Sequence, residues 1–190
     1  MSGSKWILAL LVATASLPAI AAPEKFTLDP AHTYPSLEVP HMGISWFRGK
    51  FLKTTGKVTL DRAAQTGSLE VVIDASSVDF GHDKVNEHVR SKDFLNVDKY
   101  PTITYKGALK FSDGNPTSVD GQLTLLGVTK PVKLTINSFK CIQHPMLKKE
   151  YCGADAEAEF NRADFGMNFY ADGELGKVKV RIQVEALKDG

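Results

Sequence analysis

The sequence has few of the residues from which metal centres and catalytic sites are built. Two cysteines and five histidines occur among its 190 residues, and they form no cluster with the spacing of metal ligands. Neither an HExxH segment nor a nucleophile-elbow spacing is present. We therefore expect no metal, no cofactor and no catalytic residue, and the chain is not predicted to be an enzyme.

The chain also lacks an excess of either charge. It has 23 Lys and Arg residues against 22 Asp and Glu residues, and Lys5 is the only charged residue before residue 22. A balanced chain has no strongly basic face with which to replace the counterions of a nucleic acid. We therefore expect no nucleic-acid partner. We also do not expect attraction to a strongly anionic surface to be the main source of binding.

Long hydrophobic runs are missing after the first segment. Lys5 precedes an uncharged run at 6–17, and Ala19-Ile20-Ala21 has the A-x-A pattern that signal peptidase cuts. The run is short for a bilayer span, and no second apolar stretch of about 20 residues follows. We predict a signal peptide at 1–21 and a single mature domain at 22–190. The alternative is a membrane anchor.

Cys141 and Cys152 are the two cysteines of the chain. An even pair in an exported protein is most simply a disulfide. We predict that the disulfide cross-links the two strands of a hairpin. The expected stabilisation is about 2–3 kcal/mol, from the chain entropy of a loop of this length. The alternatives are free thiols and a metal site, for which His144 is the one histidine inside the loop.

Apolar and polar residues alternate with a period of two through most of the chain from Lys25 onward. The pattern is clearest at 68–75, 132–137, 154–161 and 177–186. Such alternation gives each strand one face in water and one face in an apolar interior. Glycine and proline turn signals separate the segments.

The sequence therefore predicts an all-β chain of about eight antiparallel strands in succession. The expected strands cover 25–29, 34–41, 47–60, 67–78, 102–112, 117–126, 130–141 and 152–161, with a ninth at 174–187. Sheets of this size curl into a barrel or pair into a sandwich. Alternation alone does not distinguish these two folds.

One stretch, 83–101, has the apolar spacing of a short helix, and it is the one helical passage expected in the mature chain. Its apolar residues are Val85, Val89 and Phe94, Asp83 suits the N-cap, and Tyr100-Pro101 prevents continuation. A lone helix in a β chain covers one end of the sheet structure, because its apolar face must be buried.

Five parts of the sequence resemble the YceI-like family in their order and spacing. They are LDPAH at 28–32, HMG at 41–43 with GKF at 49–51, HVRSKDFL at 88–95 with YP at 100–101, LTLLGVTKPV at 123–132, and DFGM at 164–167. The resemblance covers essentially the whole mature chain. It implies a lipocalin-like antiparallel β-barrel with an elongated apolar tunnel, a periplasmic location, and binding of a polyisoprenoid or related lipid without established catalysis.

Pro35 lies where the family pattern has an inward apolar strand residue, and Pro40 follows in the same strand. Proline cannot donate a ladder hydrogen bond, so their strand is predicted to be an edge or to carry bulges. An exposed edge of this kind is one route to a homodimer, although proline discourages edge pairing. The sequence leaves open whether the protein is a monomer or a homodimer.

Eleven residues are candidates for contact with a ligand, chosen from the apolar faces of the strands and from the neighbourhood of the turns and the helix. They are Leu37, Val39, His41, Trp46, Phe47, Arg90, Asp93, Phe94, Leu125, Phe165 and Met167. The large apolar members either line the tunnel entrance or belong to an ordinary core, and the sequence does not separate these two cases.

Three polar candidates have two interpretations each. His41 continues the alternation of Leu37 and Val39, so it either meets a ligand head group or is a hydrogen-bonded structural histidine. Arg90 and Asp93 are close enough for an ion pair along one helical face. That pair either fixes the helix to the barrel rim or leaves Arg90 to meet a phosphate or quinone oxygen.

We interpret the chain as a periplasmic barrel that carries or sequesters a polyisoprenoid, an isoprenoid quinone or a fatty-acid derivative. Loading is expected to involve transient contact with a membrane or a membrane protein. Two alternatives stay open at this point. One is a structural or stress-related envelope protein with a packed barrel, and the other is a small hydrolase.

Overall fold

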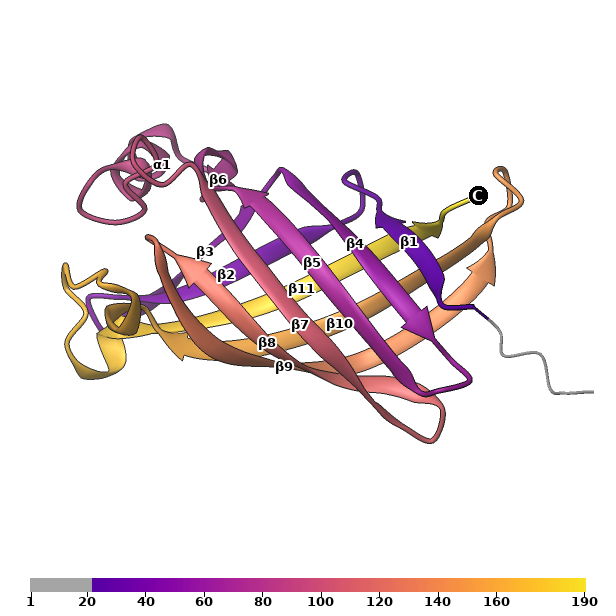
Figure 1. Cartoon of the computed structure of the whole chain (residues 1–190). Helices are drawn as coiled ribbons and strands as arrows, with labels where there is room; N and C mark the ends of the chain where they lie inside the picture. Colours follow the sequence, from indigo (N-terminus) through magenta and orange to yellow (C-terminus); the bar gives the residue numbers. More distant parts are fainter. Residues whose placement is uncertain (1–21) are drawn as a thin grey trace, which may run out of the picture.

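Eleven β-strands form one sheet that closes on itself in the computed structural model, which describes residues 22–190 (Figure 1). The strands are β1 (Glu24–Leu28), β2 (Tyr34–His41), β3 (Ser45–Phe51), β4 (Thr54–Asp61), β5 (Thr66–Asp74), β6 (Val78–Asp79), β7 (Thr102–Ser112), β8 (Asn115–Leu125), β9 (Val128–Gln143), β10 (Glu150–Asn161) and β11 (Lys177–Lys188). The helices are α1 (Asp83–Arg90) and the 3-10 turns η1 (Ala75–Ser77), η2 (Arg162–Phe165) and η3 (Gly173–Gly176). The predicted signal peptide at 1–21 lies outside the described residues.

The closed ring is an eight-strand antiparallel barrel, so the predicted fold class is confirmed. Its order is β1-β4-β5-β7-β8-β9-β10-β11, and β11 pairs back onto β1. Toward α1, β2 pairs with β11 and β3, and β3 pairs with β6. The predicted strands at 25–29 and 34–41 therefore occupy one position of the ring in succession, because both pair with β11.

Two other predicted strands are each divided into two shorter strands by a bend. The segment 47–60 divides into β3 and β4 at Leu52 and Lys53, and the segment 67–78 divides into β5 and β6 at η1. The Asp74 side chain caps η1 by accepting a hydrogen bond of 2.9 Å from the backbone N–H of Ser76. The first residues of the predicted strand 174–187 are η3 instead of strand.

The strand β2 is not an edge strand, so this prediction from its two prolines was wrong. Pro35 pairs with β11 but precedes Ser36, where pairing with β3 begins. Pro40 pairs with β3 but follows Glu38, where pairing with β11 ends. Each proline therefore has a neighbouring strand on one side, a position where a missing N–H is tolerated.

The inner faces of β10 and β11 explain why the barrel is hollow. On β11 the inward residues are β-branched or small and alternate with Lys, Arg, Gln and Glu on the outer face. On β10 the inward row consists largely of Ala154, Ala156 and Ala158. A methyl group cannot reach the barrel axis, so this wall leaves space that Leu or Phe would fill. An eight-strand barrel either fills its interior with side chains or holds one small ligand.

The helix α1 covers one end of the barrel, as predicted (Figure 1). Val85 and Val89 point into the barrel opening. Asn86 is buried and accepts a hydrogen bond of 2.7 Å from the backbone N–H of Phe80. The N-cap is His82 instead of Asp83, because Asp83 already has helical geometry and lies in the first turn, where the helix dipole favours a carboxylate.

No helix within residues 22–190 is both long and apolar enough to cross a membrane. The described chain also contains three 3-10 turns besides α1. The prediction of a single helical passage therefore holds for α-helix alone.

The predicted disulfide between Cys141 and Cys152 is formed. The two residues are direct partners across the β9–β10 hairpin, at the end of the barrel opposite α1 (Figure 1). Glu150 and the two sulfur atoms lie within 4.8 Å of one another. Because the sulfurs are bonded to each other, they are not available as thiolate metal ligands.

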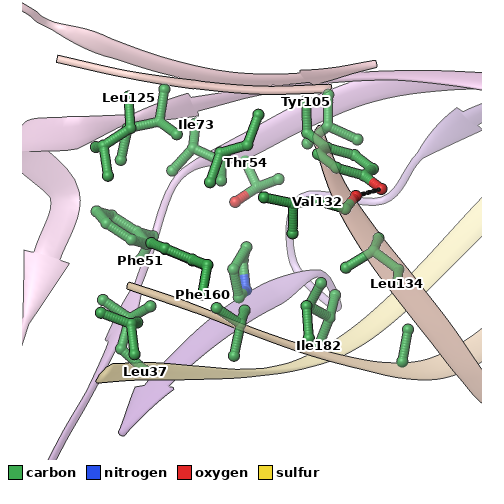
Figure 2. Close-up of a pocket in the computed structure, with 18 of the residues that line it drawn as sticks. Leu37, Phe51, Thr54, Ile73, Tyr105, Leu125, Val132, Leu134, Phe160 and Ile182 are labelled. Carbon is green, nitrogen blue, oxygen red and sulfur yellow. Dashed lines mark hydrogen bonds between the residues drawn. The ribbon is translucent and has the colours of Figure 1, made fainter. Parts of the chain in front are cut away.

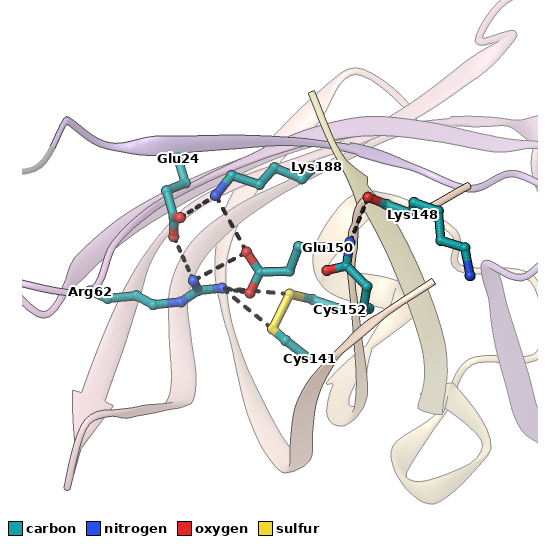
Figure 3. A network of polar contacts seen from close by, with 8 residues as sticks. Glu24, Arg62, Cys141, Lys148, Glu150, Cys152 and Lys188 are labelled. Atoms are coloured by element: carbon teal, nitrogen blue, oxygen red, sulfur yellow. Dashed lines mark hydrogen bonds and ion pairs between the residues drawn. A yellow bond between two sulfur atoms is a disulfide. The ribbon is translucent and has the colours of Figure 1, made fainter. Parts of the chain in front are cut away.

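A network of ion pairs lies beside the disulfide (Figure 3). The guanidinium of Arg62 is 2.7 Å from a carboxylate oxygen of Glu24 and 2.7 Å from one of Glu150. Lys188 pairs with the same two carboxylates. Burial acts to raise the pKa of Glu150, but the hydrogen bonds and charges of Arg62 and Lys188 outweigh it and lower that pKa. The network joins β1, β10 and β11 at this end of the barrel.

Candidate functional site

The barrel encloses a cavity of about 1040 Å³ whose wall is almost entirely aliphatic and aromatic (Figure 2). This volume is at the upper end of the range for small-molecule sites in proteins. Several side chains that face the interior, including Leu37, Leu134 and Ile182, are only half-buried because they border this space. The inner faces of the strands therefore do not meet at the barrel axis.

The cavity opens at the α1 end. There the lining includes exposed residues, among them Met42 with 75% and Tyr170 with 73% of its surface exposed. At the other end the lining residues are buried, as Phe26 and Leu60 show with 1% and 3% exposed. A long molecule would therefore enter beside α1.

An aromatic cluster joins the two sides of this mouth. The ring centroids of His88 and Phe94 are 5.0 Å apart, those of Phe94 and Phe169 are 5.5 Å apart, and those of His88 and Phe169 are 6.1 Å apart. His88 belongs to α1, whereas Phe169 belongs to the segment between η2 and η3. Side-chain packing between these two segments therefore sets the width of the opening.

The structure places seven of the eleven predicted contact residues on the cavity wall. They are Leu37, Val39, His41, Phe47, Phe94, Leu125 and Met167. The other four, Trp46, Arg90, Asp93 and Phe165, are not part of the wall. A separate physical reason places each of these four residues away from the wall.

Trp46 and Phe165 differ in where they lie outside the wall. Trp46 precedes the inward-facing Phe47 on β3, so strand alternation turns it outward. There its ring lies 4.6 Å from the Nζ of Lys179. Phe165 is 1% exposed and packs edge-on against Phe160 at 5.3 Å, in the core beside η2.

The predicted ion pair between Arg90 and Asp93 is not formed, so this interpretation was wrong. Arg90 is the last residue of α1, and the chain turns before it reaches the exposed Asp93. Arg90 instead donates a hydrogen bond of 2.9 Å from Nη2 to the backbone carbonyl of Val78 on β6. It therefore holds the helix to the rim, which was one of its two predicted roles.

His41 lies at the cavity wall near the mouth, where alternation with Leu37 and Val39 predicted it. Its ring stacks on Phe47 with centroids 4.0 Å apart and planes 9° apart. The next residues, Met42 and Gly43, have φ of 54° and 73° and turn the chain back into β3. The imidazole is half-buried and borders the space that a ligand would occupy.

Two polar side chains lie deeper on the wall (Figure 2). Tyr105 donates a hydrogen bond of 2.7 Å to the carbonyl of Val132, and burial raises the pKa of its hydroxyl, which stays neutral. Thr54 is 1% exposed, and its hydroxyl has no hydrogen-bond partner within residues 22–190. The wall therefore stays apolar at both residues, because protein atoms cover the hydroxyl of Thr54 and a backbone carbonyl accepts from that of Tyr105.

Arg162 is a wall residue that the sequence reasoning missed. It is 7% exposed and donates hydrogen bonds to the carbonyl of Met167 at 3.2 Å and to that of Tyr170 at 2.6 Å. Its Cζ is 5.4 Å from the centroid of Phe94. The signal was present, because Arg162 continues the inward row that ends at Phe160 with the same period of two.

Comparison with known proteins agrees with this fold. The YceI-like domain model matches residues 26–186. Protein YceI of Shigella flexneri is 32% identical over 171 residues, which cover 90% of this chain and 89% of the relative.

Among solved structures, BcnA of Burkholderia cenocepacia superposes with a TM-score of 0.68 at 24% identity, covering 83% of this chain and 98% of that one. A polyisoprenoid binding domain from Saccharophagus degradans, implicated in plant cell wall breakdown, superposes with a TM-score of 0.60 at 15% identity, covering 86% and 98%. At these identities the superpositions establish the fold. The family model and the 32% identity establish more: this chain belongs to the YceI-like domain family.

Proposed function

We propose that this protein binds one long-chain amphiphilic lipid inside the barrel and carries or sequesters it in the periplasm. The candidates are a polyisoprenoid, an isoprenoid quinone and a fatty-acid derivative. The observation that carries the proposal is the apolar cavity of about 1040 Å³ that opens at one end. The packed barrel that was the alternative does not agree with this cavity.

The energetics favour a ligand with a long apolar tail. Burial contributes about 0.8 kcal/mol per CH₂, so one isoprene unit contributes roughly 3–4 kcal/mol before the costs of ordering are subtracted. A hydrogen bond to a charged head group contributes about 1.5–3 kcal/mol. We therefore expect affinity to rise with tail length and the head group to set the orientation.

The name of the Saccharophagus degradans domain supports the same class of ligand, because that protein is described as polyisoprenoid binding. Export through the N-terminal segment and transient membrane contact during loading are part of the proposal. Cell fractionation of the full chain tests the first of these. A signal confined to the cytoplasm would contradict periplasmic carriage.

The direct test is organic extraction of the purified protein followed by mass spectrometry, and titration of the delipidated protein with polyprenols. Leu125→Trp places a large ring on the wall and is expected to abolish uptake while the β-sheet circular dichroism is kept. The control is Val72→Trp on the outer face of β5, where Val72 is 42% exposed. A preparation that contains no lipid and does not bind added polyprenols would overturn the proposal.

A further inference from the structure

The wall of the cavity carries a buried cation that has no acidic partner. Arg162 is 7% exposed, and no carboxylate lies within ion-pair distance of it in the described part of the chain. Its two hydrogen bonds go to the backbone carbonyls of Met167 and Tyr170. A guanidinium has five N–H donors, so these two bonds leave donors that no other group within residues 22–190 accepts from.

A structural role explains only part of this arrangement. The two carbonyl bonds hold the segment between η2 and η3, and a neutral amide could make bonds of the same kind. A buried charge is costly unless it is paired, yet an arginine does not escape that cost by losing its proton. Burial lowers the pKa of Arg162, and the group nevertheless stays charged. An anionic group within reach of the unused N–H donors would offset this cost.

Within residues 22–190, the rest of the wall has no acidic side chain. Its one lysine, Lys84, lies near the mouth, where His41 and His88 also line the cavity. Phe94 covers Arg162 at 5.4 Å and reduces its contact with water. A cavity with apolar walls and charge of one sign concentrates that potential at its opening.

We propose that Arg162 binds the acidic head group of an amphiphile whose tail occupies the cavity, with a phosphate or a carboxylate as the group recognised. This inference rests on the proposed function and narrows it to acidic lipids. It also assigns to Arg162 the role in head-group binding that the sequence suggested for Arg90. The planar guanidinium suits either oxyanion, because both accept two parallel N–H hydrogen bonds.

The experiment compares lipids that share a tail and differ only in charge. One pair is a polyprenyl monophosphate and the polyprenol of equal length, and the other is a fatty acid and its methyl ester. Delipidated protein is titrated with all four, as wild type, Arg162→Gln, Arg162→Lys and Arg181→Gln. Arg181 is the control, because its side chain is 63% exposed on the outer face of β11.

We expect the wild type and Arg181→Gln to prefer the acidic member of at least one pair by about tenfold or more. Arg162→Gln is expected to lose that preference while its affinity for the uncharged lipid is kept, and Arg162→Lys to retain part of it. The pair with the larger preference identifies the head group. Thermal melting shows whether each variant is folded, and Arg162→Lys carries the test if Arg162→Gln is not.

The two proposals fail in different ways. Equal binding of the acidic and uncharged lipids by the wild type, or an unchanged preference in both Arg162 variants, would overturn the role of Arg162 and leave lipid binding intact. Absence of binding to all four lipids would overturn the proposed function itself.

Discussion

The ring of Tyr105 lies so close to the backbone of Gly121 that a Cβ atom at residue 121 would be 2.2 Å from the tyrosine hydroxyl oxygen. A glycine in a strand interior marks such a close approach. The same hydroxyl donates to the carbonyl of Val132, so Gly121 permits a hydrogen bond that joins β7 to β9 across β8.

We expect Gly121→Ala to displace this ring into the cavity and break its hydrogen bond. The expected loss in the free energy of unfolding is about 2–3 kcal/mol, from overpacking and the lost bond together. The measurement is denaturant unfolding followed by circular dichroism. Gly153→Ala is the matched control, because the nearest atom to its new Cβ is 3.5 Å away. Equal destabilisation of the two variants would contradict the close contact.

The alanine row of β10 is expected to set the usable length of the cavity. Ala154 lies further from the mouth than Ala158, so Ala154→Leu would shorten the tunnel without blocking its entrance. We predict a several-fold loss of affinity for long-tailed lipids and little change for short ones, because only long tails reach this depth. Titration with a series of tail lengths checks this.

The exposed Ala108 on β7 provides the control for that experiment. Ala108→Leu adds the same side chain to the outer face, and its length profile should match that of the wild type. A uniform loss of affinity across all lengths in Ala154→Leu would mean that the leucine obstructs entry instead of limiting depth.

Strand alternation predicted much of the wall, and it failed where the alternation was not followed through. It correctly placed Leu37, Val39 and His41 on one face. Trp46 is large and apolar, but it cannot face inward together with its neighbour Phe47. Arg162 continues the inward row of β10, although an arginine is not expected on an apolar face.

Other features depend on contacts that no local pattern encodes. Alternation does not say whether inward side chains meet across the barrel. That depends on the lengths of the side chains that face each other from strands far apart in sequence. Phe165 is the last residue of the 3-10 turn η2, three residues beyond Arg162, where the inward row of β10 has ended. The bend that puts β1 and β2 in one ring position is likewise set by their shared partner, β11.

The disulfide should stabilise the closed end of the barrel. Cys141 and Cys152 are separated by 11 residues in sequence, and constraining a loop of this size in the unfolded chain contributes about 2–3 kcal/mol. We expect the double variant Cys141→Ser, Cys152→Ser to lose roughly that free energy of unfolding. Reductant should destabilise the wild type by a similar amount and leave the double variant unchanged. A wild type that is insensitive to complete reduction would contradict this prediction.

The bend between β1 and β2 is expected to make stability depend on pH. The Nδ1 of His32 lies 2.8 Å from a carboxylate oxygen of Asp29, and the hydroxyl of Tyr151 donates to the same oxygen at 2.7 Å. The hydrogen bond with Asp29, and then its charge, raise the pKa of His32. The same bond, assisted by Tyr151 and the backbone of Ala31 against the effect of burial, lowers the pKa of Asp29.

The sign of the effect follows from these two directions. A raised pKa for His32 gives stability that is complete below the unfolded value of about 6.5 and is lost as the pH rises through the folded value. A lowered pKa for Asp29 gives stability that is present above about 3.9 and is lost as the pH falls through its folded value. The pair should therefore stabilise the barrel most between about pH 4 and pH 6.5.

The measurement is the difference in Tm between the wild type and His32→Gln as a function of pH. We expect the difference to be largest near pH 5 and to shrink as the pH rises above about 6.5, since the ion pair disappears when the imidazole loses its proton. The exposed His82→Gln provides the control for losing an imidazole elsewhere. A difference that grows with pH between 6 and 8 would mean that neutral His32, and not the ion pair with Asp29, holds the bend.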